Sequence, residues 1–206
     1  MTDDPFRIAD MAALEALYDA PATAATVKVA RRITPAYRAW MAQARFCVLA
    51  TVGPEGTDCS PRGDDGPVVT ELDPGTLALP DWRGNNRLDS LRNIVRDGRA
   101  SLMFMVAGSE NVVRVNGQAR LTVAPDLLAR LSRDGRAPRL AVVLDIAEVY
   151  FQCARALMRA RLWAGPDGSA DALPSPGDIL AEMSEGALDG AAYDAAWPAR
   201  ARQGLW

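Results

Sequence analysis

Histidine is absent from the 206-residue sequence, and cysteine is rare. Without histidine the chain has no Ser-His or Cys-His pair, no histidine-ligated haem or zinc, and no side chain with an unperturbed pKa near neutrality. Cys47, Cys59 and Cys153 are odd in number and widely separated, which favours a reducing cytosol over a disulfide framework. We therefore predict no metal site, and we expect a bound organic cofactor to carry any chemistry.

A basic excess and long apolar runs are also missing. Lysine and arginine total 23 against 26 aspartates and glutamates, so the formal net charge is −3, which argues against a nucleic-acid partner. No apolar run approaches the length of a membrane span, and the acidic start, MTDDPFR, lacks the apolar region of a secretory signal. The expected location is cytoplasmic, with no membrane partner.

The composition that remains is ordinary for a globular protein, with 49% hydrophobic and 24% charged residues. The length allows one domain with a substantial core plus a tail. We expect a helical segment at 1–45 that packs on the domain, the domain itself at 46–163, and a tail at 164–206 rich in Gly, Pro, Ala, Asp and Ser. Trp197 and Trp206 suggest that parts of the tail dock on the body.

Short apolar segments separated by turn residues indicate a strand-rich domain with one helix inserted midway. Strands are expected at 46–52, in the segment leading into 60–64, and at 68–72, 76–79, 100–107, 112–123 and 139–149, and helices at 8–44, 86–97, 125–131 and 150–163. Many short antiparallel-looking strands favour a small barrel over a βαβ sheet. No G-x-G-x-x-G opens a helix, so a Rossmann site is not expected.

The loop between the strand at 76–79 and the following helix carries the strongest functional signal. Its sequence, LPDWRGNNRLDSLRN, contains Arg83, Asn85, Asn86 and Arg87 close to the start of the helix. Unpaired backbone N–H groups and the helix dipole favour an anion there, and guanidinium and carboxamide donors are suited to a phosphate. The alternative interpretation is a solvated loop with an Asn cap.

The strand expected at 112–123 has two different faces. One face, which includes Val113 and Val115, is almost wholly apolar, whereas the other carries Arg114 and further polar residues. A core face and a solvent face explain this alternation most simply. The alternative is that Arg114 lies over a cofactor or a subunit interface.

Four ordered motifs, LATVGPEGTDCSPRGD, GTLALPDWRGNNRLDSLRNI, ASLMFMV and VVRVNGQARL, resemble the pyridoxamine 5′-phosphate oxidase-like family of FMN-binding split barrels. The similarity is greatest to a bacterial group that carries the GNNRLDSLRNI signature, and it covers roughly residues 10–163. It implies a mainly β, α+β fold, a six-stranded antiparallel split barrel with flanking helices. It also implies a homodimer with two FMN molecules in clefts at the subunit interface.

The resemblance implies cofactor-binding roles for four groups of residues. The first group, which would lie beside the flavin and its phosphate tail, consists of Arg62, Gly63 and Asp64. The second group would pass along the isoalloxazine ring and offer backbone groups to its polar edge; it consists of Leu79, Pro80 and Asp81. The third group would hold the phosphate and consists of Asn85, Asn86 and Arg87. The fourth group would contact flavin or substrate, from this subunit or its partner, and consists of Arg114, Arg159 and Trp163.

The end of the matching region departs from the family pattern. Pyridoxamine phosphate oxidases end in a motif with arginine and histidine that holds the pyridoxal substrate, whereas this chain has RARLW and no histidine. Vitamin B6 synthesis is therefore not expected. We predict an FMN-dependent oxidoreductase acting on another small molecule, with hydride transfer at flavin N5 and no catalytic side chain. The alternatives are a reductase dependent on the deazaflavin F420, a non-catalytic FMN-binding protein, and a structural protein that has lost its cofactor.

Overall fold

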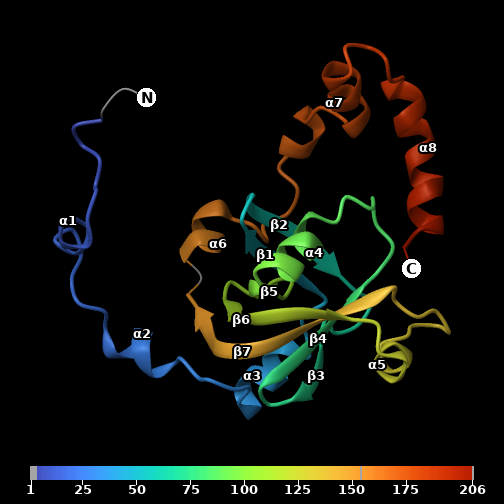
Figure 1. Cartoon of the computed structure of the whole chain (residues 1–206). Helices are drawn as coiled ribbons and strands as arrows, with labels where there is room; N and C mark the ends of the chain where they lie inside the picture. The colour runs from blue at the N-terminus through green and yellow to red at the C-terminus, as the bar shows by residue number, and fades with distance from the viewer. Residues whose placement is uncertain (1–3, 154, 206) are drawn as a thin grey trace.

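A computed structural model describes residues 4–153 and 155–205 of the chain. Its centre is one antiparallel sheet of seven strands in the order β2-β1-β5-β6-β7-β4-β3 (Figure 1). The strands are β1 (Phe46–Gly53), β2 (Gly56–Gly63), β3 (Thr70–Asp73), β4 (Thr76–Asp81), β5 (Arg99–Met105), β6 (Val112–Thr122) and β7 (Leu140–Gln152). The helices are α1 (Met11–Glu15), α2 (Thr23–Val27), α3 (Pro35–Met41), α4 (Asp89–Arg96), α5 (Pro125–Arg130), α6 (Arg155–Ala160), the 3-10 helix η1 (Ser169–Ala172), α7 (Pro176–Met183) and α8 (Gly190–Gln203).

The sheet has seven strands, not the six that the resemblance implied. Within the described residues β2 and β3 lie at its two ends without pairing to each other, so the sheet is not closed into the expected barrel. At one edge of the sheet, β3 pairs with β4 through a tight turn at Asp73, Pro74 and Gly75. The carboxylate of Asp73 accepts a hydrogen bond from the Gly75 N–H at 2.7 Å and closes this turn. The α+β class with flanking helices agrees with the expectation.

The hydrophobic core is formed mainly by one face of the strands. Along β1, β5 and β6 the buried residues alternate with more exposed ones, as a half-buried strand requires. In β4 and β7 four consecutive residues are buried, because their second face is covered near α5 by a smaller apolar cluster. The central side chains of the main core are Leu49, Leu77, Leu102, Phe104, Val115 and Val142.

Helix α4 packs against β1, β2 and β6 through Leu91 and Ile94. The Asn93 amide donates to Thr51 Oγ1 at 3.2 Å, and a Cβ on Gly53 would lie only 2.3 Å from Asn93 Oδ1. Glycine at position 53 therefore allows the Asn93 side chain to approach this closely. The helix begins at Asp89 rather than at the expected residue 86, because the intervening loop contains two left-handed residues.

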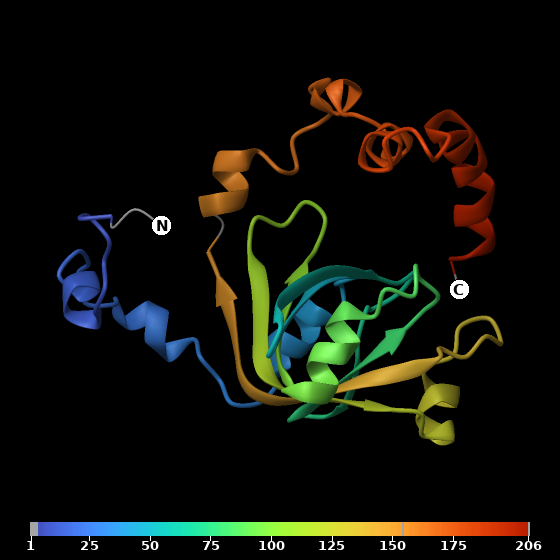
Figure 2. The ribbon, with the colours of Figure 1, turned by 45° about the horizontal axis from the view of Figure 1, so that its top comes forward.

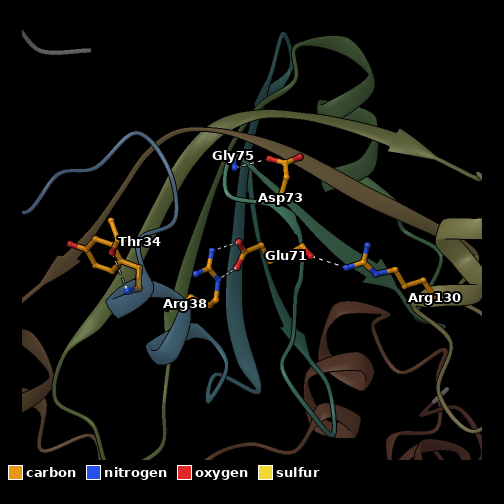
Figure 3. A network of polar contacts seen from close by, with 7 residues as sticks. Thr34, Arg38, Glu71, Asp73, Gly75 and Arg130 are labelled. Carbon is orange, nitrogen blue, oxygen red and sulfur yellow. Dashed lines mark hydrogen bonds and ion pairs between the residues drawn. The ribbon is translucent and has the colours of Figure 1, made fainter.

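The β3–β4 hairpin is held from both sides by arginines. Arg38 of α3 makes two 2.6 Å contacts with the Glu71 carboxylate, and Arg130 of α5 donates to the Glu71 backbone oxygen at 2.9 Å. Figure 3 shows Glu71 between these two side chains. The edge strand is thus fixed by the two helices that flank it.

The expected N-terminal helical region is divided into three short helices. In α1 and α2 every residue is exposed, and both helices lie away from the sheet (Figures 1 and 2). Met11 in α1 is therefore exposed, whereas Met41 and Ala44, further along the chain, are buried in the core. That the whole segment 1–45 packs on the domain stays a prediction.

The C-terminal region forms two packed helices, α7 and α8, on the far side of the sheet from α1 and α2 (Figure 2). Asp194 of α8 accepts hydrogen bonds from the Gly177 N–H at 2.9 Å and from Ser175. Trp197 stacks on Tyr193 of its own helix and is 49% exposed, while Trp206 lies outside the described residues. The predicted amphipathic helix at 150–163 is wrong at its start, because β7 continues to Gln152 by pairing with β6.

Within residues 4–153 and 155–205, the helices are all too short or too polar to span a lipid bilayer.

Candidate functional site

A groove of about 840 Å³ lies where β2, β4, the loop before α4, α4 itself and the start of β7 meet. Five of the residues predicted to bind the cofactor line it, although they come from separate parts of the sequence. These are Arg62, Asp81, Asn85, Asn86 and Arg87. A volume of this size is typical of small-molecule sites.

The floor of the groove is a directed chain of hydrogen bonds that starts at Arg62. Its Nη1 donates to Asp81 Oδ1 at 2.6 Å, and the two side chains are only 19% and 13% exposed. Its Nε donates to Ser60 Oγ at 3.3 Å. Because a guanidinium only donates and a carboxylate only accepts, the direction of the chain follows from its two ends.

The other end of this chain is a carboxylate on β2. Ser60 Oγ lies 2.9 Å from Ser90 Oγ, and Ser90 in turn donates to Asp58. The chain therefore ties β2 to the first turn of α4 and, through Arg62, to β4. This satisfied network holds the Arg62 guanidinium in one place at low exposure.

The loop before α4 leaves the start of that helix open toward the groove. Asn86 and Leu88 both have left-handed backbone angles, with φ of 61° and 65°. Leu88 is the N-cap, and within the described part of the chain its side chain makes no capping bond. Asn85 Oδ1 accepts from the Arg87 N–H at 3.0 Å, and Arg87 Nε donates to Asp89. The asparagines thus shape the loop instead of capping the helix, which leaves helical N–H groups available for an anion.

Sequence reasoning missed Arg139, which lines the groove at the start of β7. Its Nη1 donates to Asn86 Oδ1 at 2.8 Å, and its backbone N–H donates to the backbone carbonyl oxygen of Asp81 at 3.2 Å. Arg139 comes close to Asn86 only because β7 pairs with β4, where Leu140 is opposite Asp81. No local signal in the sequence reveals that register.

Apolar side chains complete the lining. They are Pro61, Trp82, Leu88, Leu91, Val95, Leu121 and Leu140. Val95 is 73% exposed on the outer face of α4, next to Arg92 and Arg96, which also line the groove. The groove therefore combines a polar, arginine-rich part with an apolar surface that suits a flat aromatic group.

Four predicted residues lie close to the groove but outside its lining. Gly63 ends β2 opposite Phe46, while Leu79 and Pro80 are buried in β4. The Asp64 carboxylate has 0% exposure and accepts hydrogen bonds from Trp82 Nε1 and Arg133 Nε, both at 3.2 Å. In this chain Asp64 serves a structural contact between loops.

The last three predicted residues lie in other parts of the chain. Arg114 stacks over the Tyr150 ring at 5.4 Å and donates to Gln152. Trp163 donates from Nε1 to the Ser109 oxygen at 2.7 Å, and Arg159 is exposed on α6. That Arg114 lies over a cofactor or a subunit interface, and not simply on a solvent face, stays a prediction.

Comparison with known proteins places the chain in a family. The family model "Pyridoxamine 5'-phosphate oxidase" matches residues 33–153, whereas none of the curated proteins matches the sequence. Among solved structures, a putative pyridoxamine 5'-phosphate oxidase from Lactobacillus delbrueckii is 24% identical, with 59% of this chain and 95% of that chain covered and a TM-score of 0.47.

Two further solved structures are similar to the chain at lower identity. HupZ from Group A Streptococcus is 12% identical, with 59% and 96% of the two chains covered and a TM-score of 0.48. An FMN-binding protein from Syntrophomonas wolfei is 14% identical, with 55% and 86% covered and a TM-score of 0.43. The family match spans more than half of the chain, including all seven strands and the whole groove, so the protein belongs to the pyridoxamine 5′-phosphate oxidase family.

Proposed function

We infer that the groove binds FMN and that the protein is an FMN-dependent oxidoreductase acting on a small molecule. The observation that carries this proposal is the cluster of Arg62, Asn85, Asn86 and Arg87 beside the open start of α4, next to an apolar wall. Membership of the pyridoxamine 5′-phosphate oxidase family supports it.

The donors in the groove match the chemistry of the FMN tail. A phosphate monoester carries close to two negative charges and three acceptor oxygens, and arginine forks and helix N–H groups are the partners it prefers. Arg62 is held in place by Asp81 and Ser60, so little conformational freedom is lost when it binds an anion. The apolar residues around Val95 and Leu140 are suited to the flavin ring.

When bound, FMN would supply hydride transfer at its N5 atom. The chain's own residues would bind and orient the cofactor and exclude water from its apolar side. The lack of histidine is compatible with this division of labour, because no protein nucleophile or strong acid–base group is needed. It also supports a substrate other than a pyridoxal compound.

One observation favours F420 as the second candidate cofactor. Arg92 and Arg96 line the groove in addition to the residues proposed to hold one phosphate. A cofactor with a longer acidic tail would use these further cations. A non-catalytic FMN-binding protein remains the other alternative, and steady-state turnover with a nicotinamide donor and an acceptor would separate it from an enzyme.

We also propose a homodimer in which FMN lies at the subunit interface. Arg114, Arg159 and Trp163 lie in parts of the chain other than its own groove, so in a dimer they would be available to the partner's cofactor. Phe46 and Phe151, which are 38% and 42% exposed, offer apolar area for such a contact.

The visible absorption spectrum of the purified protein, followed by mass spectrometry of what heat releases, tests the cofactor. A two-band flavin spectrum with released FMN is the expected result. A single band at shorter wavelength with a deazaflavin mass would support F420. A colourless protein that takes up no added FMN would contradict the flavoprotein proposal.

A further inference from the structure

We propose that Arg139 is an additional phosphate ligand of the groove, held in position by the buried carboxylate of Asp64. This inference rests on the proposed flavin function. It adds Arg139 as a ligand of that site and Asp64 as the residue that positions it. Because Arg139 would bind the phosphate monoester of FMN, the site should prefer phosphorylated flavin over neutral flavin.

The charge balance of the groove supports this role for Arg139. Arg62, Arg87 and Arg96 each pair with a carboxylate, from Asp81, Asp89 and Glu55 respectively. Like Arg92, Arg139 has no carboxylate partner among residues 4–153 and 155–205. Its positive charge is therefore not neutralised by an ion pair before a ligand binds, and it is exposed to the groove.

The contact between Arg139 and Asn86 joins the two walls of the groove. Arg139 uses one N–H to donate to Asn86 Oδ1 at 2.8 Å, so most of the donors of its guanidinium fork remain for another acceptor. The same contact occupies the carbonyl end of Asn86, which leaves its amide nitrogen as the end that can donate to an anion. Both side chains are thus oriented with donors to spare.

Asp64 fixes the distance between the two loops that carry these residues. Its carboxylate accepts from Trp82, which begins the loop leading to Asn86, and from Arg133, which precedes Arg139 by six residues. The backbones of Arg133 and Arg136 pair with each other and close the second loop. A fully buried carboxylate that lost one of these donors would be costly, so the two loops are held together strongly.

Titration of the flavin-free protein with FMN and with riboflavin, followed by quenching of flavin fluorescence, tests the role of Arg139. For Arg139→Ala we expect FMN affinity to fall about 10- to 100-fold, the loss of a charge-assisted hydrogen bond, with riboflavin affinity unchanged within about twofold. Arg136→Ala is the matched control, because this exposed arginine is in the same loop but outside the groove lining. It should leave both affinities unchanged.

The outcomes of this titration separate the phosphate role of Arg139 from the flavin proposal itself. Equal losses for FMN and riboflavin in Arg139→Ala, or no loss for either, would overturn the phosphate role while leaving the flavin proposal intact. A wild-type protein that binds neither flavin would overturn both proposals together.

Arg133→Ala tests the positioning role of Asp64, again with Arg136→Ala as its control, since both changes leave the backbone pair between the two residues in place. We expect Arg133→Ala to lower the ratio of FMN to riboflavin affinity about three- to tenfold, an intermediate loss because Arg139 is displaced but still present. If this variant melts at a lower temperature but keeps the wild-type ratio, Asp64 has a structural role alone and this part of the inference is wrong.

Discussion

Arg87 is the residue at which the sequence and the geometry of the groove point most directly to an anion. It follows two asparagines at the open start of α4, and its guanidinium is 80% exposed beside Asp89. We expect Arg87→Ala to weaken FMN binding by about one to two powers of ten, because each charge-assisted hydrogen bond contributes about 1.5–3 kcal/mol. Isothermal titration of the flavin-free protein measures this, and an unchanged dissociation constant would remove Arg87 from the site.

Arg83 provides the control for that experiment. It belongs to the same loop and was a candidate on sequence grounds, but it is outside the groove lining in the structure. Arg83→Ala should therefore retain nearly full FMN affinity. A comparable loss in both variants would indicate a general charge effect instead of a defined contact.

Cys47 is the residue whose chemistry is most changed by the fold. Burial raises the pKa of its thiol to about 12 from the ordinary 9.0, an effect that Arg62 partly opposes. Cys59 and Cys153 are exposed. We expect a thiol reagent at pH 8 to modify Cys59 and Cys153 in the native protein and Cys47 only after unfolding, which mass spectrometry of the labelled chain will show. Rapid native labelling of Cys47 would contradict the burial.

The same shift makes stability depend on pH. Above pH 9 the unfolded thiol ionises while the folded thiol stays protonated, so the folded state binds more protons and the free energy of unfolding falls as pH rises from about 9 to about 12. The loss approaches about 1.4 kcal/mol per pH unit at most. Urea unfolding at pH 8 and pH 10 should show this slope for the wild type and a smaller slope for Cys47→Ala.

At the scale of elements, the β6–β7 ladder depends on glycine at position 117. The register shifts beside it, at Asn116, and a Cβ on Gly117 would lie 2.0 Å from the Asp145 backbone oxygen. We expect Gly117→Ala to lower the free energy of unfolding by about 2–3 kcal/mol, because two paired backbones would have to separate. Urea denaturation measures it.

Gly165→Ala is the matched control for that change. A Cβ at position 165 would meet nothing within 4 Å, and the residue has no left-handed backbone angle. The midpoint of urea unfolding for Gly165→Ala should stay close to that of the wild type. A similarly small effect at Gly117 would mean that the β6–β7 pairing adapts more easily than its geometry indicates.

At the scale of the whole molecule, the proposed dimer accounts for residues that the single chain leaves outside its groove. Light scattering after gel filtration should give twice the 22.1-kDa chain mass. Arg114→Ala should then reduce FMN binding through the partner subunit, without disturbing the groove of its own chain. A monomer that holds FMN with full affinity would contradict an interfacial cofactor site.

Much of this architecture can be predicted from local patterns. Apolar alternation predicted the positions of the strands, and the sequence from Leu79 to Asn93 predicted a strand end, a polar loop and a helix in that order, as the structure has them. The start of α4 was predicted three residues too early, because nothing local reveals that Asn86 and Leu88 adopt left-handed angles. Backbone conformations of this kind are imposed by packing on both sides of the loop.

By itself, the sequence determined the properties that depend on neighbouring residues: the family motifs, the strand and helix periodicities, and the exclusion of histidine chemistry. Only the tertiary structure decided which distant residues share the groove. It brought Arg139 to Asn86 and buried Asp64 between Trp82 and Arg133, away from the groove lining. The physical reason is that strand register and loop closure are long-range properties, so β4 and β7, about 60 residues apart in sequence, must first pair before such contacts exist.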